Sequence, residues 1–175
     1  MSRAAPRVGF ALALLVGTGM LSCGPERGHD AAADTVAVRV GDLVIYDGYV
    51  AAPVVEHVTM AFVTIENIGT ESDALVGAST DLADRVRLHS QVLDGPLGRS
   101  SPVNRITIEP GRALVLEAGG YHLTLEDLRV QLAPGDSVTL RLRFERAGTA
   151  NVRLPVLSHL ELVHNPSPLA GDTEG

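Results

Sequence analysis

The sequence is short of several residues on which common folds and sites depend. It has one cysteine, no tryptophan and only 3% aromatic residues, and all 14 of its basic residues are arginine. A single thiol can form neither a disulfide within the chain nor a zinc site built from several thiolates. Because aromatic rings are so scarce, Val, Leu and Ile must build the core, and a β-branched bias favours strands.

Signatures of catalysis and of nucleic-acid binding are also missing. The chain has no Gly-rich phosphate loop and no Gly-x-Ser-x-Gly elbow. Its net charge is −7, without a basic cluster, which makes it a poor ligand for nucleic acid. Asp and Glu are scattered over expected turns and solvent faces, where solvation explains them. The sequence therefore predicts neither an enzyme nor a nucleic-acid-binding protein.

The amino terminus has the pattern of an export signal. Arg3 and Arg7 precede Val8–Leu21, a run of fourteen residues without charge. A bilayer-spanning helix needs about twenty apolar residues, so this run fits the core of a signal peptide better. We predict a signal peptide over residues 1–22.

The only cysteine lies directly after this segment. The run ends in "MLSC" with small Ser22 before Cys23 and Gly24 after it, and it resembles a bacterial lipobox in which Met20 takes the usual leucine position. We predict that Cys23 is lipidated and that residues 23–34 tether the domain to a bacterial membrane, on its periplasmic side. The alternative is an ordinary cleaved signal peptide in which Cys23 is incidental.

Residues 35–157 have the pattern of one all-β domain. In "SVTLRLRFE" the residues Val138, Leu140, Leu142 and Phe144 alternate with polar ones, which indicates a strand with one buried face. The stretch "MAFVTIEN" is apolar on both faces, as in an inner strand. Such segments recur between breaks rich in Gly and Pro, which is typical of an antiparallel sandwich or barrel. We expect residues 158–175 to form a flexible tail.

Six histidines remain as candidate ligands: His29, His57, His89, His122, His159 and His164. The first lies in the tether and the last two in the tail, where solvation is the simpler explanation. His89 ends the strand-like "DRVRLH", and His122 follows the turn "AGGY".

The surroundings of these two histidines resemble those of a known family. From about Asp47 to Val156 the chain contains, in order, "AFVTIENIG", "LVGAST", "RVRLH", "SPV", "IEPG", "LEAGGYHLTLEDL", "LAPGDSVTLRLRFERAG" and "VRLPV". These pieces are similar to the PCu(A)C-type periplasmic copper chaperones. The resemblance implies a cupredoxin-like Greek-key β-sandwich that holds one Cu(I) at one end.

The resemblance also implies a ligand set, from which this chain departs. The family pattern is His, ten residues, Met, twenty-one residues, then His-x-Met. His89 and His122 match its histidines, whereas Ser100 and Thr124 stand at its methionines with the spacing kept. Hydroxyl groups are poor ligands for the soft ion Cu(I). Two imidazoles can hold Cu(I) nearly linearly or, with water or a carboxylate, can hold Cu(II) or Zn(II).

A replacement donor could come from "EHVTMAF". His57 and Met60 are three residues apart, so an extended strand directs them to opposite faces and at most one of them can help. Met60 is an auxiliary candidate, although core packing beside Phe62 is the expected role of its side chain.

Two functions follow from these observations. In the first, the protein is an extracytoplasmic copper-binding metallochaperone that delivers the ion to a partner, which the resemblance implies is a haem-copper respiratory oxidase. In the second, it is a binding or assembly module that keeps the sandwich but has lost copper transfer or has changed its metal. If another soft donor from elsewhere in the chain fills the space left at Ser100 and Thr124, the first function, copper delivery, is favoured.

Overall fold

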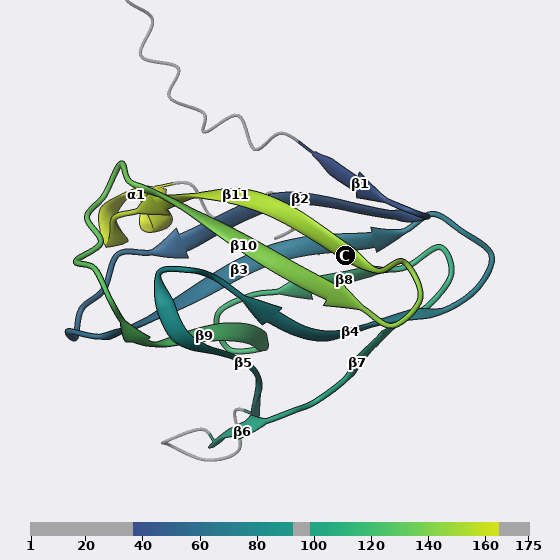
Figure 1. The fold of residues 1–175 in the computed structure, drawn as a ribbon, viewed down its shortest axis with the longest axis horizontal. Coiled ribbons are helices and arrows are strands. Elements are labelled where there is room, and N and C mark those ends of the chain that lie inside the picture. The colour runs from purple at the N-terminus through teal and green to yellow at the C-terminus, as the bar shows by residue number, and fades with distance from the viewer. Residues whose placement is uncertain (1–36, 93–98, 165–175) are drawn as a thin grey trace, which may run out of the picture. The chain divides into compact units, whose positions relative to one another are not determined.

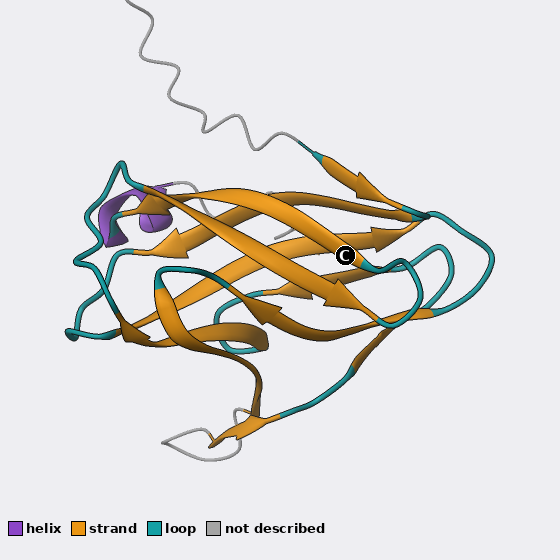
Figure 2. Cartoon of the chain, viewed as in Figure 1, coloured by secondary structure: helices purple, strands orange, loops and turns teal. Residues whose placement is uncertain are grey.

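The described part of the protein consists almost entirely of strands (Figures 1 and 2). A computed structural model describes residues 37–92 and 99–164, all within the compact unit Ala32–Gly175. The elements are β1 (Val38–Val40), β2 (Leu43–Ala51), β3 (Val58–Asn67), β4 (Asp73–Ser79), β5 (Ala83–Val92), β6 (Arg99–Pro102), β7 (Ile106–Ile108), β8 (Ala113–Leu116), β9 (Tyr121–Leu128), β10 (Ser137–Phe144), β11 (Thr149–Leu157) and α1 (His159–His164). The predicted signal peptide, Cys23 and the predicted tether lie outside the described residues.

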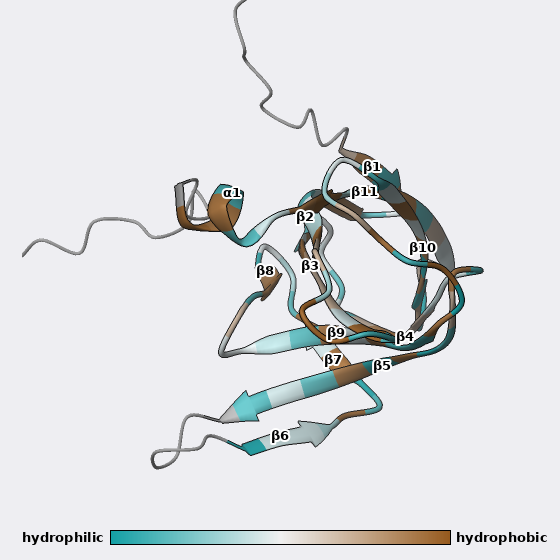
Figure 3. Ribbon diagram, turned by 90° about the vertical axis from the view of Figure 1, so that its left-hand side faces the viewer, coloured by the Kyte–Doolittle hydropathy of each residue, from teal (hydrophilic) through white to brown (hydrophobic). Residues whose placement is uncertain are grey.

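The strands form a curled sheet whose two layers share β11. The hydrogen-bonded order is β6-β5-β9-β8-β3-β2-β11-β10-β4-β7, with β1 paired to β2 and a further pairing of β9 with β3. β11 pairs with β10 in an antiparallel manner and with β2 in a parallel manner, so it joins the layers. Figure 3 shows the strands curving around a common interior. The expected all-β, cupredoxin-like sandwich is confirmed.

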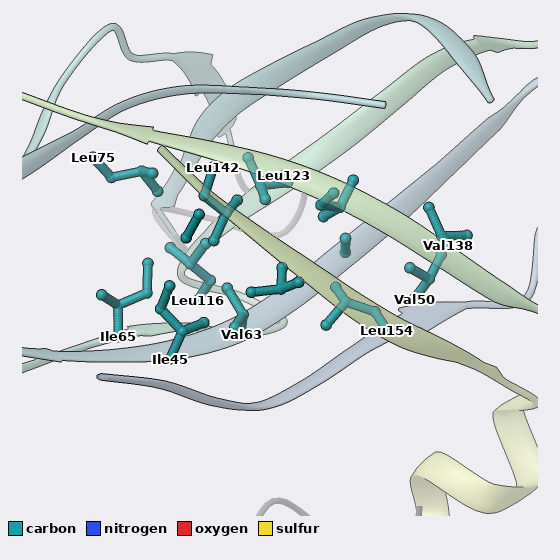
Figure 4. Packing of buried hydrophobic residues seen from close by; sticks show 14 of the residues in the cluster. Ile45, Val50, Val63, Ile65, Leu75, Leu116, Leu123, Val138, Leu142 and Leu154 are labelled. Carbon is teal, nitrogen blue, oxygen red and sulfur yellow. The ribbon is translucent and has the colours of Figure 1, made fainter. Parts of the chain in front are cut away.

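The register of β10 agrees with its alternating sequence. Val138, Leu140, Leu142 and Phe144 are at most 3% exposed, whereas the residues between them face solvent. Figure 4 shows Val138 and Leu142 of β10 facing side chains of β2 and β3 across one interior. A slip of one residue would bury two arginines in place of these apolar groups, at a cost of several kcal/mol.

β3 is an inner strand, as its two apolar faces indicate, but Met60 does not join the core. β3 pairs with β2 on one side and with β8 and β9 on the other. Its residues Ala61, Val63 and Ile65 belong to the core, while Met60 is 43% exposed. The expectation of core packing for Met60 is wrong because period two places it on the outer face.

A bulge in β2 puts an aromatic pair on that outer face. The β2–β3 register shifts between Tyr46 and Tyr49, where Asp47 has φ 50. The next residue, Gly48, is buried, and a Cβ there would collide with Leu154 Cδ2, so a larger residue would force that core side chain to shift. After the bulge Tyr49 lies opposite Phe62, with ring centroids 5.0 Å apart.

One carboxylate has a structural role that sequence reasoning missed. Asp73 is only 6% exposed, and its oxygens accept hydrogen bonds from the backbone N–H groups of Ala74, Arg146 and Ala147 at 2.7–2.9 Å. It therefore fixes the β10–β11 turn. The general expectation of solvated carboxylates fails at Asp73 because two of its three partners come from a turn more than seventy residues away.

Part of the expected tail is ordered as α1. Ser158 and Glu161 form a reciprocal cap: Ser158 N–H donates to Glu161 Oε2 at 2.7 Å, and Glu161 N–H donates to Ser158 Oγ at 3.3 Å. The Ser-x-x-Glu spacing is the sequence signal for this cap. Among residues 37–92 and 99–164, no helix has the length and apolar character needed to cross a bilayer.

Candidate metal centre

His89 and His122 lie directly opposite each other on neighbouring strands. β5 and β9 are antiparallel, and His89 is the register partner of His122. Their ring centroids are 5.6 Å apart and the ring planes differ by 19°. Residues paired in this way project from the same face of a sheet. Thus the two histidines predicted from the sequence, which are thirty-three positions apart in the chain, form one pair.

The Nδ1 atom of each histidine ring has a hydrogen-bond partner within the domain. His122 Nδ1 is 3.2 Å from the carbonyl oxygen of Gly120, and His89 Nδ1 is 2.9 Å from Thr124 Oγ1. Because a carbonyl oxygen only accepts, Nδ1 of His122 donates, and the lone pair of the neutral ring is on Nε2. Such hydrogen bonds orient metal-binding histidines in proteins. The Nε2 atoms are therefore the candidate ligand atoms.

The environment favours a neutral His89. Burial, and then the neighbouring His122, lower the pKa of His89 from its ordinary value, and Arg87 acts in the same direction against the opposing effect of Glu126. Metals bind the neutral imidazole, so this shift keeps the ligating form present to more acidic pH. His122 is only 3% exposed, while His89 is half-buried and leaves the pair accessible from its side.

The two hydroxyl residues flank the histidine pair on opposite sides. Thr124 follows His122 by two positions on β9 and contacts His89 diagonally through its hydroxyl. Ser100 lies on β6 opposite Gln91, so it shares a sheet face with His89. The positions inferred from the family spacing therefore lie around the pair. Their own hydroxyls are hard donors and are poorly suited to Cu(I).

Met60 extends this group from the third strand. It is the register partner of Thr124 in the β3–β9 pairing and therefore projects on the same face, diagonal to His122. Phe62 follows two residues later on the same face of β3, where its ring lies 5.0 Å from that of Tyr49. Sequence reasoning could not place Met60 on the site face because both faces of its strand are apolar.

Nearby carboxylates are engaged by arginine. Glu126 lies on the same face as His122 and Thr124, but its Oε2 is 3.2 Å from Nε of both Arg85 and Arg87. Asp127 pairs with Arg85 at 2.5 Å. Across residues 37–92 and 99–164, no group of three or more His, Cys, Asp or Glu side chains is arranged to hold a metal. A third ligand from this set would require these ion pairs to break.

Among the described histidines, His57 and His159 do not join the pair. The carbonyl of His57 accepts from Leu128 N–H, which places it six residues along β9 from His122, about 20 Å at the rise of a strand. His159 is exposed in α1, and His164 is its last residue. His29 lies outside the described residues.

The spacing of the pair is compatible with one shared ion. An ion about 2 Å from a nitrogen of each ring lies about 3.2 Å from each centroid, so shared ligands have centroids up to about 6.4 Å apart. The observed separation of 5.6 Å is within this limit. Among the described residues, Met60 is the only one that contains sulfur, so it is the candidate for a third soft donor.

Solved structures with a similar fold include copper-binding domains. The structure of a copper-bound PCuAC domain from PmoF2 matches with a TM-score of 0.61 at 21% identity, over 70% of this chain and 97% of that one. The solution structure of Cu(I)-DR1885 from Deinococcus radiodurans matches with a TM-score of 0.53 at 29% identity, over 74% and 85%. The first likeness establishes the fold. The sandwich and the paired histidines define a domain of the PCuAC type, as the sequence resemblance predicts.

Within that class the family is more specific. Residues 43–156 match the family described as "Putative lipoprotein LpqE-like", and the chain belongs to it. A curated relative, "Putative lipoprotein Lxx21020" of Leifsonia xyli subsp. xyli, is 31% identical over 99 residues. The match covers 56% of this chain and 60% of the relative.

Proposed function

We propose that this protein is an exported lipoprotein that binds one copper ion through His89 and His122 and passes it to an acceptor. The observation that carries the proposal is the direct pairing of the two rings across β5 and β9. Their Nδ1 atoms are held by Gly120 and Thr124, which makes Nε2 of each ring the candidate ligand atom. The likeness to copper-bound PCuAC domains supports copper as the ion.

We propose further that Met60 supplies a thioether in place of the methionines absent at positions 100 and 124. It is exposed, lies opposite Thr124 and is diagonal to His122. Two imidazoles and one thioether suit Cu(I), whereas Glu126, a carboxylate on this face, is held by arginines. This donor set favours Cu(I) over Cu(II) or Zn(II).

A chain that begins at residue 24 tests directly whether Met60 binds the ion, because Met60 is the only residue in that chain that contains sulfur. We expect X-ray absorption of its Cu(I) complex to show one sulfur ligand and two nitrogen ligands. Replacing Met60 with leucine, a nearly volume-conserving change, should remove the sulfur signal. It should also weaken Cu(I) binding about tenfold, about 1.4 kcal/mol, in competition with a Cu(I) chelator. A wild-type complex without sulfur would contradict the role of Met60, and the absence of any competing Cu(I) binding would contradict the function.

The second part of the proposal is attachment to the membrane. The short uncharged run before Cys23 and the lipoprotein names of the family and of the curated relative support it. A periplasmic location on a bacterial membrane would place the copper pair outside the cytoplasm. Stable anchoring takes two acyl-type chains, which a bacterial lipoprotein carries on its first cysteine.

Replacing Cys23 with serine should therefore release an exported, soluble form of the protein. Fractionation of the producing cells, with mass spectrometry of the mature amino terminus, measures this directly. We expect wild-type protein in the membrane fraction with Cys23 as its first residue. Wild-type protein that is wholly soluble and cleaved at another position would contradict lipidation.

The acceptor is proposed from the family resemblance. A respiratory oxidase subunit that takes copper outside the cytoplasm would fit a half-buried, accessible His89. One observation favours the alternative, a binding or assembly module that has lost copper transfer. Thr124 already forms a hydrogen bond with His89 Nδ1, so the histidine pair is held in place without an ion. Copper transfer from the loaded protein to an apo-oxidase domain, followed by absorption spectroscopy, separates the two.

A further inference from the structure

A cleft of about 840 Å³ opens on the domain between two of its strand pairs. One wall comes from residues 76–79 of β4 with the outward side chains of β10, and the other from residues 86–88 of β5 and the segment 102–104. In Figure 3, β5 extends beyond the curled body with β6 along its edge, which leaves this side open. The cleft is separate from Met60 and from the β3–β9 side of the histidine pair.

The charge of the cleft is opposite to that of the whole chain. The chain carries 21 acidic residues and a net charge of −7, yet none of the described residues that line the cleft is Asp or Glu. Three arginines do, of which Arg87 is paired with Glu126. Arg141 and Arg143 have no carboxylate within ion-pair distance among the described residues. The cleft therefore has two guanidinium groups without counter-charges.

The neighbours of these two arginines are small and neutral. Arg141 lies between Ser79 and Asn151, and Arg143 lies between Gly77 and Thr149. Arg143 Nη2 is 3.4 Å from the carbonyl oxygen of Val76, and a Cβ on Gly77 would be only 3.1 Å from that nitrogen. The guanidinium group of Arg143 therefore lies against the backbone of Val76 and Gly77 at the wall of the cleft. Planar guanidinium groups bind carboxylates with two parallel hydrogen bonds.

The two walls also present strand edges to each other. β4 pairs with β7 only through Asp73–Leu75, so its edge is free from Val76 onward. β5 is engaged from Leu88 onward, where Val103 N–H donates to the carbonyl oxygen of Leu88, so its free edge lies before Leu88. No ladder joins β4 to β5 in the described part of the sheet. Edges of this kind accept an extended peptide by backbone hydrogen bonding, with alternate side chains in adjacent pockets. Val86 and Val103 line the cleft and are only partly buried, so they provide apolar surface for such side chains.

We propose that this cleft is a docking site for an extended acidic peptide segment of a partner protein. Arg141 and Arg143 bind its carboxylates, and the edges of β4 and β5 bind its backbone. A small inorganic anion would use the arginines alone, so the strand edges and the apolar surface favour a peptide. This inference is independent of copper and of the histidine pair.

The test is a fluorescence anisotropy titration with a labelled eight-residue peptide of alternating Glu and Val, using the chain from residue 24 onward at low salt. A peptide with Gln in place of Glu should bind at least tenfold more weakly. The double variant Arg141→Gln, Arg143→Gln should lose at least tenfold in affinity for the acidic peptide. The matched control, Arg39→Gln with Arg112→Gln, makes the same change in net charge away from the cleft and should change affinity no more than twofold.

Each other outcome overturns the proposal. Equal losses in the two double variants would mean non-specific attraction, and equal affinity for both peptides would exclude carboxylate recognition. If phosphate displaced the peptide at concentrations near the dissociation constant of phosphate itself, the cleft would be a site for small anions. Amide shifts on peptide binding should cluster at residues 76–79 and 86–88, and shifts confined elsewhere would contradict the location. Thermal melts confirm that the variants are folded.

Discussion

Replacing His122 with alanine is expected to abolish Cu(I) binding by the chain from residue 24 onward. His122 offers Nε2 to the ion while its Nδ1 donates to Gly120, so the variant loses one of two imidazole ligands. The affinity should fall by at least about 100-fold, since even outer-shell partners of metal ligands cost about 10–100-fold. Competition with a Cu(I) chelator measures the loss.

The controls for this prediction are chosen by position. His122 is buried, and its removal leaves a cavity, so His89→Ala at the half-buried partner should show the same loss with less effect on the thermal melt. His57→Ala, about 20 Å along the sheet, and His159→Ala in α1 should leave binding unchanged. Binding that survives both His122→Ala and His89→Ala would mean that the copper lies elsewhere, with His159 and His164 as the next candidates.

Adding methionines at the two hydroxyl positions is expected to strengthen Cu(I) binding. Ser100→Met and Thr124→Met together supply two thioethers on either side of the histidine pair. The second change also removes the hydroxyl that now bonds to His89 Nδ1. We expect a gain of at least about tenfold, about 1.4 kcal/mol, for Cu(I). Zn(II) should gain nothing because thioethers are soft ligands.

A matched variant separates this effect from the general consequence of adding methionine. Ser101 is next to Ser100 but projects from the other face of β6, and Thr139 lies on the exposed face of β10. Ser101→Met with Thr139→Met therefore makes the same change in composition away from the pair and should leave Cu(I) affinity unchanged. A double variant at positions 100 and 124 that binds no better than wild type would mean that these side chains do not reach the ion.

The strands were predictable wherever one face is apolar and the other polar. β10 is the clearest case, because its alternation has period two over the whole strand and only one register avoids burying arginine. The positions of His89 and His122 followed from their spacing in a family resemblance. The structure adds that they are register partners, which depends on the pairing of β5 with β9 and not on either strand alone.

The local sequence pattern could not predict whether a residue is buried wherever its burial depends on segments far apart in the chain. Met60 was expected in the core, since "MAFVTIEN" is apolar on both faces and nothing in it indicates which face the other layer covers. From its sequence context Asp73 is expected at the surface, but in the structure backbone N–H groups of the β10–β11 turn donate to its carboxylate.

The sequence by itself determined the all-β class, the inward face of β10 and the export-like amino terminus, because each depends on residue periodicity or composition along the chain. The candidate histidines came from the family resemblance that the sequence carries. Only the tertiary structure decided that Thr124 contacts His89, that Met60 is exposed beside them, and that Arg141 and Arg143 line a cleft without acidic residues. The reason is physical: hydrogen bonds and charges act over a few ångströms in space, and the pairing of distant strands sets which groups come within that range.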